Sequence, residues 1–185
     1  MSDGTLTVER VCPYPRVTDI LKIIIDTSFF TPESRDRGSF IHAATVIDEQ
    51  GDLDESFEAT ALYMPYIRAW RKFLAEHECR WTHVEQRLVH EQFGYTGQPD
   101  RIGTVDGKPS VVDIKTGAAA KWHRLQGAAY LAMVPNPQRY QRLVVRLQED
   151  GKAPIDPFLP HTYIADLGVF LACLTIHNYK LNGGK

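Results

Sequence analysis

Two carboxylates and a lysine lie on either side of one sharp turn in the middle of the chain. Asp100 precedes the pair Asp106-Gly107, and Asp113 and Lys115 follow it. An Asp-Gly pair between two β-prone runs is a strong signal for a two-residue hairpin turn. Paired positions of such a hairpin have residue numbers that sum to 213, as 106 and 107 do, so Asp100 is predicted to lie opposite Asp113.

This register places three charged side chains on one face of the hairpin. Lys115 shares a face with Asp113, whereas Val112 and Ile114 point to the other face and can enter the core. Carboxylates about 4 Å apart repel by about 4 kcal/mol at an effective dielectric near 20. Either one carboxyl is protonated or cations lie close by. Lys115 supplies one charge, and Mg²⁺ or Mn²⁺, which prefer oxygen ligands, would supply the rest.

The spacing alone leaves an alternative open. Asp-x-Lys is common on solvated strands, so an exposed salt-bridge cluster fits these three residues equally well. A single β-bulge would also break the register. The choice between a catalytic centre and a surface cluster therefore depends on the rest of the sequence.

Charge, length and missing motifs narrow the class of protein. The 185 residues carry 21 basic and 23 acidic side chains, a formal net charge of −2. A protein that coats nucleic acid is usually basic, so contacts with DNA should be local, and a passive DNA-binding protein is disfavoured. The length suits one α/β domain over residues 1–185. There is no GxxxxGK[ST] motif, so unwinding would need a partner such as a helicase.

The cysteines and the ends of the chain indicate the cellular environment. Cys12, Cys79 and Cys173 are scattered and form no CxxC pair, which disfavours a disulfide framework or an iron–sulfur cluster and favours core thiols. The N-terminal residues do not resemble a secretory signal. The longest apolar stretch, Ile164 to Ile176, contains Asp166 and is too short to span a bilayer. A cytoplasmic protein of a bacterial or phage-infected host cell is expected.

The elements that position the charged residues can be read from periodicity and breakers. We predict a short helix at 17–25 capped by Thr18 or Asp19, a loop, and then helices at 38–48 and 55–77, where Pro65 can introduce a kink. A strand at 82–93, the hairpin, a helix at 118–133, a strand at 140–147, a loop at 149–160 and a helix at 164–179 follow. This order predicts a mixed central sheet with helices on both sides.

The motifs around the hairpin, taken together, resemble the PD-(D/E)XK nuclease superfamily. Pro99-Asp100 and Asp113-Ile114-Lys115 spell its name. A GxxxH motif at Gly38 and His42, a glutamate at Glu85, and Gln126 with Tyr130 in a Q-x3-Y motif are most similar to the RecB-type exonuclease branch, which includes mitochondrial genome maintenance and phage exonucleases. The resemblance covers Gly38 to Tyr130. It implies a restriction-endonuclease-like α/β core.

The resemblance also implies a role for each matched residue. Asp100, Asp113 and the Ile114 carbonyl would hold Mg²⁺ or Mn²⁺, which polarises the scissile phosphate. His42 would reach the metal from its helix, and Glu85 would be a further ligand, with Glu91 as the competing candidate. Lys115 would orient or help deprotonate the attacking water and offset charge in the transition state. The two remaining residues of the site, Gln126 and Tyr130, would hold Lys115 and the phosphate.

Simpler explanations exist for several of these residues. A histidine on a helix is often only packed, and a tyrosine at helical spacing is often core. The basic residues Lys121, His123 and Arg124 suit DNA phosphates, but a solvated helix face explains them almost as well. Trp70, Trp81 and Trp122 could stack on bases, although we expect at least two of the three in the core.

The sequence therefore predicts a metal-dependent deoxyribonuclease, with exonuclease activity favoured by the resemblance. A structure-specific endonuclease and a catalytically inactive DNA-binding module are the alternatives. RNA as substrate is also open, because nothing in the sequence reads a 2′-hydroxyl. A role in DNA repair, recombination or processing is expected, with a helicase, recombinase or single-strand-binding protein as partner.

Overall fold

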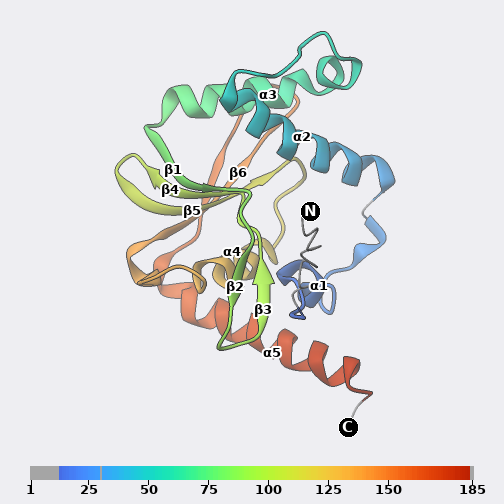
Figure 1. Cartoon of the computed structure of the whole chain (residues 1–185), viewed down its shortest axis with the longest axis vertical. Helices are drawn as coiled ribbons and strands as arrows, with labels where there is room; N and C mark the ends of the chain where they lie inside the picture. Colours follow the sequence, from blue (N-terminus) through green and yellow to red (C-terminus); the bar gives the residue numbers. More distant parts are fainter. Residues whose placement is uncertain (1–12, 30, 184–185) are drawn as a thin grey trace, which may run out of the picture.

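A five-stranded mixed sheet forms the centre of the molecule (Figure 1). The computed structural model describes residues 13–29 and 31–183. The strand order is β1-β4-β5-β6-β7, and only the pair β5 and β6 is parallel. The strands are β1 (Cys79–Val84), β4 (Arg101–Val105), β5 (Lys108–Lys115), β6 (Gln141–Arg146) and β7 (Ile155–Pro157).

Helices cover both faces of this sheet. Helices α2 (Pro32–Gln50) and α3 (Glu58–Glu76) pack on one face, and α1 (Val17–Leu21), α4 (His123–Leu131) and α5 (Tyr163–Leu181) pack on the other (Figure 1). Alternation along β5 divides its side chains between the two cores. Val112 and Ile114 enter the core under α2 and α3, and Val111 enters the core under α4 and α5. The predicted mixed sheet with helices on both sides is confirmed.

The hairpin that carries the charged residues has the predicted register. Val105 pairs with Lys108 and Arg101 with Val112, so the next step places Asp100 opposite Asp113. Both turn residues have positive φ, 51° and 74°, as a type I′ hairpin turn requires. No bulge interrupts β4 and β5, and the turn chemistry alone therefore fixed the pairing.

The first two helices differ from the prediction at their N-termini. Helix α2 begins at Pro32 rather than Gly38, because Thr31 accepts a hydrogen bond from the Ser34 N–H (3.2 Å) and proline suits the first helical position. Helix α1 is capped by neither Thr18 nor Asp19, which both lie inside it after the extended residue 16. It is also shorter than predicted.

The expected strand from 82 to 93 is two strands in two sheets. Strand β1 ends at Val84, and Glu85 has a φ of 49°, which interrupts the extended chain. The chain then forms β2 (Leu88–His90), which pairs with β3 (Tyr95–Gly97) in a separate two-stranded sheet. This break directs the chain out of the central sheet immediately beside Asp100, where the first strand of the hairpin begins.

Two further predictions need correction. Helix α4 begins at His123 rather than at residue 118, and the predicted loop at 149–160 contains the edge strand β7. Three short 3₁₀ helices, Thr27–Phe29, Pro137–Arg139 and Pro160–Thr162, complete the elements.

Among the described residues, no helix is both long and apolar enough to cross a membrane. Cys79 is half-buried and Cys173 buried, while Cys12 lies outside the described residues.

Candidate active site

The charged residues of the hairpin line a cavity of about 290 Å³. His42 from α2, Asp100 before β4, Asp113 and Lys115 from β5, and Gln126 and Tyr130 from α4 all border it. Asp100 and Asp113 are only 5% and 4% exposed, which excludes the exposed salt-bridge cluster as an explanation. Six of the residues singled out from the sequence are therefore gathered around one hollow.

His42 and Asp100, which line the cavity, form a close group with Glu85 beside them. The Nδ1 atom of His42 lies 3.1 Å from Asp100 Oδ1 and 3.4 Å from Glu85 Oε1. One ligand atom from each residue lies within 4.8 Å of the others. Asp100 uses its second oxygen to accept a hydrogen bond from the Ile114 N–H. Three of the predicted ligands thus form one group, and Asp113 as a further ligand stays a prediction.

Glu85 is fixed at the cavity by the backbone that interrupts β1. Its N–H donates to the Asp100 carbonyl at 3.0 Å, and Gln98 Nε2 donates to its Oε2 at 3.1 Å. The other oxygen, Oε1, is buried and accepts no hydrogen bond in the structure. Glu91, the competing candidate, is exposed and does not belong to the group with His42 and Asp100. The geometry therefore favours Glu85 over Glu91, a choice that the sequence alone left open.

Asp113 and Lys115 form an adjacent ion pair on the next strand. Lys115 Nζ lies 2.7 Å from Asp113 Oδ2 and 5.7 Å from the centre of the Trp122 ring. On α4, Gln126 Nε2 donates to the Tyr130 hydroxyl at 2.9 Å, and both side chains are buried. Gln126 Oε1 has no hydrogen-bond partner. The Q-x3-Y pair thus presents a free acceptor at the cavity that also contains Lys115.

Burial opposes every charge in the cavity, and the neighbouring charges decide the outcome. Burial raises the pKa of Asp113 to about 6, aided by Asp100 and opposed by Lys115. Burial would lower the pKa of His42, but Asp100 and Glu85 raise it to about 10. Burial would likewise lower the pKa of Lys115, yet Asp113 and Asp100 raise it above its usual value. Protonated His42 and Lys115 in turn overcome burial and lower the pKa of Asp100.

The donor set fits a hard divalent cation. Carboxylate oxygens and one imidazole nitrogen are ligands that Mg²⁺ and Mn²⁺ accept in proteins. The buried Glu85 Oε1, which accepts no hydrogen bond, is an atom that such a cation would satisfy. His42, Glu85 and Asp100 would hold the ion, and Asp113 lies on the adjacent strand. A carbonyl ligand from Ile114 stays a prediction.

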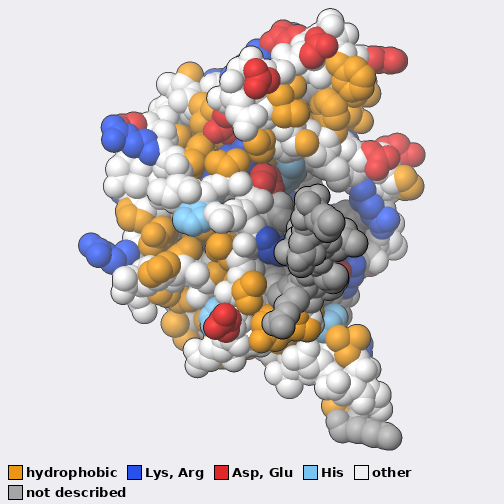
Figure 2. Space-filling view, in the orientation of Figure 1, with side chains coloured by type: hydrophobic (Ala, Val, Ile, Leu, Met, Phe, Trp, Pro, Cys, Tyr) orange, Lys and Arg blue, Asp and Glu red, His pale blue; other side chains and the backbone are white. Residues whose placement is uncertain are grey.

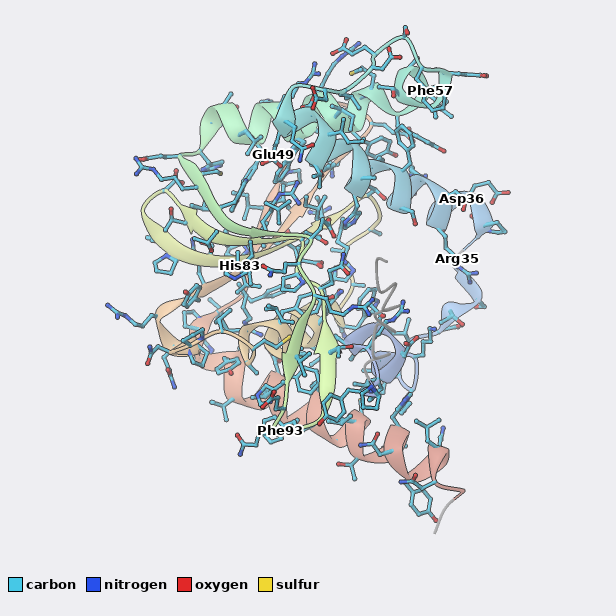
Figure 3. All side chains as sticks on the ribbon, in the orientation of Figure 1. Arg35, Asp36, Glu49, Phe57, His83 and Phe93 are labelled. Carbon is cyan, nitrogen blue, oxygen red and sulfur yellow. The ribbon has the colours of Figure 1, made fainter. Side chains whose placement is uncertain are left out.

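Arg101 is a residue of this site that the sequence analysis missed. Its guanidinium is fully buried, lies 2.6 Å from Glu49 Oε1, and donates to Thr45 Oγ1 at 3.1 Å and to the Asp100 carbonyl at 2.8 Å. Glu49 belongs to the last turn of α2 (Figure 3). Since Thr45 and Glu49 are three and seven residues after His42, they share its helix face. Arg101 therefore fixes α2 in the register that presents His42 to Asp100.

The predicted basic patch on α4 is only partly present. Lys121 and Arg124 are exposed, and Arg124 Nε lies 3.1 Å from Asp166 Oδ1. His123 is only 6% exposed, and burial together with nearby Lys115 lowers its pKa to about 4. It is therefore neutral at pH 7 and does not belong to a basic surface. Two other cations, Arg16 and Arg87, line the cavity instead, without any motif that pointed to them.

Comparison with known proteins agrees with this geometry. The model of the PD-(D/E)XK nuclease superfamily matches residues 12–156, and the chain belongs to this superfamily. It is thus a nuclease of a group that uses divalent metals, with a restriction-endonuclease-like core. No curated protein matches the chain in sequence.

Two solved structures resemble the fold. One is the crystal structure of a candidate exonuclease from Eubacterium rectale, with a TM-score of 0.63 and 11% sequence identity over 99% of this chain and 89% of the other. The other is the crystal structure of the protein SSO0001, with a TM-score of 0.33 and 14% identity over 84% of this chain and 83% of the other. This TM-score is too low to support a common fold. At 11% identity, the first likeness supports the fold alone.

Proposed function

We propose that this chain is a divalent-metal-dependent deoxyribonuclease that removes nucleotides from DNA ends, as a member of the RecB-type branch. The observation that carries the proposal is the His42–Glu85–Asp100 group, in which Asp100 is buried, beside the Asp113–Lys115 ion pair. A divalent cation bound there would supply electrophilic activation of the scissile phosphate and of the attacking water. Mg²⁺ and Mn²⁺ are the ions that this donor set favours.

The protein groups would bind and orient the reactants. The raised pKa of Lys115 supports a charged ammonium that orients water and offsets negative charge in the transition state, rather than a group that accepts a proton. Gln126 Oε1 is a buried acceptor free to receive a hydrogen bond, and its neighbour Tyr130 keeps its proton because burial raises the pKa of the hydroxyl. These two residues are proposed to hold the substrate phosphate and Lys115 in position.

Action at an end, rather than within a duplex, is supported by the depth of the site. Both catalytic carboxylates are almost fully buried, so the phosphate must enter the cavity to reach them. A free or frayed strand can do this more easily than an intact duplex. A structure-specific endonuclease of the same superfamily is the alternative. We place the activity in DNA repair, recombination or processing in the cytoplasm, with unwinding supplied by a helicase, recombinase or single-strand-binding partner.

Digestion of end-labelled single-stranded, linear duplex and closed circular DNA tests this function. Each substrate is incubated with Mg²⁺, Mn²⁺ or EDTA and with wild type, Lys115→Ala or the control Lys72→Ala, an exposed lysine on α3. We expect linear DNA to shorten only with metal, circles to survive, and Lys115→Ala to lose roughly 10²- to 10³-fold in rate.

The other outcomes separate the alternatives. Lysine-dependent cutting of circles would establish an endonuclease with the same active site. Absence of any cutting, or a Lys115→Ala variant as active as wild type, would contradict the active-site assignment and favour an inactive DNA-binding module. Matched RNA substrates in the same assay decide between DNA and RNA.

A further inference from the structure

The catalytic cavity is one of three hollows that share lining residues. Thr18 lines both the catalytic cavity and a second hollow of about 470 Å³ between the α1–α2 connection and the start of α4. Trp122 lines this second hollow and a third one of about 230 Å³. The second hollow falls within the size range of pockets that hold small organic ligands. The three hollows are therefore neighbours, and together we call them the Trp122 path.

Like Trp81, Trp122 is half-buried and packs against a core cluster, but it differs from the other two tryptophans because it also lines two hollows. Trp70 is fully buried, and Trp81 stacks on it with 6.4 Å between the ring centres, so both belong to the core under α3. Trp122 is half-buried and lines two hollows, and its ring lies 5.7 Å from Lys115 Nζ. The prediction that at least two of the three tryptophans are core residues is confirmed. The third is in reach of a ligand beside the catalytic lysine.

Cations border this path along its length. Arg16 and Arg87 lie at the catalytic cavity, Arg35 and Lys22 at the second hollow, and Lys121 and Arg124 at the third. Lys22 is paired with Asp19, and Arg124 with Asp166, whereas the exposed Arg35 is in no ion pair among the described residues. Figure 2 shows Lys and Arg side chains next to acidic ones at the edge where α2 begins, and further acidic side chains at the α2–α3 end.

An aromatic ring between cations is the combination that binds single-stranded nucleic acid. Unpaired bases stack on aromatic side chains, and Lys or Arg follow the phosphates. A paired base within a duplex cannot present its face to an indole ring. We propose that the Trp122 path binds unpaired nucleotides of a DNA strand beside the scissile phosphate, with a base on Trp122 and a phosphate near Arg35. This inference rests on the proposed deoxyribonuclease function and names single-stranded DNA as the substrate form that the site selects.

Equilibrium binding without cleavage tests the role of Trp122. Fluorescence anisotropy in EDTA measures the affinity of a short labelled oligothymidylate and of a blunt duplex for each variant. Trp122→Ala should weaken oligothymidylate binding roughly tenfold or more, because one base stack is lost, and should leave duplex binding unchanged. Trp122→Phe should bind nearly as well as wild type. Phe57→Ala, which removes an exposed aromatic ring at the far end of the molecule (Figure 3), is the matched control.

An oligonucleotide that contains abasic sites tests the stacking itself. Wild type should bind it more weakly than oligothymidylate, by a factor similar to the effect of Trp122→Ala, and Trp122→Ala should not distinguish the two. A thermal melt of each variant confirms that it is folded. If folded Trp122→Ala and wild type bind oligothymidylate equally, the inference is wrong.

Arg35 provides a second, independent variant. Arg35→Ala should weaken oligothymidylate binding and reduce the slope of log affinity against log salt by about one, since one phosphate contact is lost. Arg68→Ala, an exposed arginine on α3, is the control and should change neither value. An unchanged salt slope in Arg35→Ala would overturn the placement of the phosphate. If wild type cleaves DNA but all these variants bind equally, only this inference fails; if wild type neither binds nor cleaves DNA, the proposed function fails with it.

Discussion

Two buried ionic clusters on the same molecule differ in how completely their polar atoms are paired. In one, Arg142 and Asp166 are each 2% exposed. Both Asp166 oxygens are bound, by Arg124, Arg142 and Thr162, and both terminal nitrogens of Arg142 have acceptors. In the other cluster, Glu85 Oε1 and Gln126 Oε1 are buried without a hydrogen bond. The first cluster is complete within the protein, and the second lacks partners that a ligand would supply.

The comparison shows how a structural ion pair is distinguished from a site built to bind. Buried polar groups almost always find partners, so atoms left without one require an explanation. In the Arg142 cluster, charge and hydrogen bonds balance and link β6 to α5. In the catalytic site each carboxylate lies beside a cation, yet Glu85 Oε1 and Gln126 Oε1 accept no hydrogen bond. A variant in each cluster should therefore affect a different property.

The largest effect is expected on folding, from Asp166→Ala in the complete cluster. This change leaves the buried Arg142 guanidinium without its carboxylate and should lower the free energy of unfolding by about 3–5 kcal/mol. Chemical denaturation measures the loss. The rate of cleavage by the protein that remains folded should stay close to that of wild type. Unchanged stability in this variant would remove the distinction between the two clusters.

The next effect is expected on catalysis, from Asp100→Asn in the catalytic cavity. Cleavage should fall by roughly 10²-fold or more, since the group that holds both His42 and the cation is lost. The free energy of unfolding should change by only about 1 kcal/mol, because an amide oxygen can still accept from Ile114 and Glu85 still lies beside His42. Cleavage kinetics and denaturation, measured on the same preparation, test this pair of values. A loss of stability as large as that of Asp166→Ala would contradict it.

The smallest effect at neutral pH concerns His123 on α4, whose contribution changes only in acid. Its pKa is lowered from 6.5 to about 4 by burial, so the unfolded chain binds a proton before the folded protein does. Stability from this neutral histidine is complete above pH 6.5 and is lost as the pH falls towards 4, by up to about 3 kcal/mol. His123→Gln, which cannot titrate, should show a shallower loss of stability over this range. Equal slopes in wild type and variant would place the histidine in an aqueous environment instead.

Short-range rules were sufficient for the hairpin. Asp106-Gly107 specifies the turn, and the alternation of a strand then places Asp100 opposite Asp113 with no further information. Helix existence was likewise predictable from apolar spacing, although Thr31 as the cap of α2 was overlooked. The superfamily followed from motif order, which physical reasoning about single residues does not supply.

Long-range packing decided what the sequence did not reveal. Arg101 is buried because Glu49, 52 positions earlier, meets it, and no local pattern encodes that contact. The break at Glu85 places a non-glycine residue at positive φ, against its intrinsic preference. Strand β7 exists only because β6 offers it an edge. His123 looked like a surface cation until its burial was known.

The central claim is that the His42–Glu85–Asp100 group binds a divalent cation. Calorimetric titration of Mn²⁺ into DNA-free wild type and into Asp100→Asn tests it most directly. Wild type should bind Mn²⁺ with release of protons at pH 7, since His42, with a pKa raised to about 10, must lose its proton to become a ligand. Proton release is measured by repeating the titration in buffers of different ionisation enthalpy. Asp100→Asn should bind roughly tenfold more weakly or worse. Equal Mn²⁺ affinity in the two proteins, or no binding to wild type, would contradict the account.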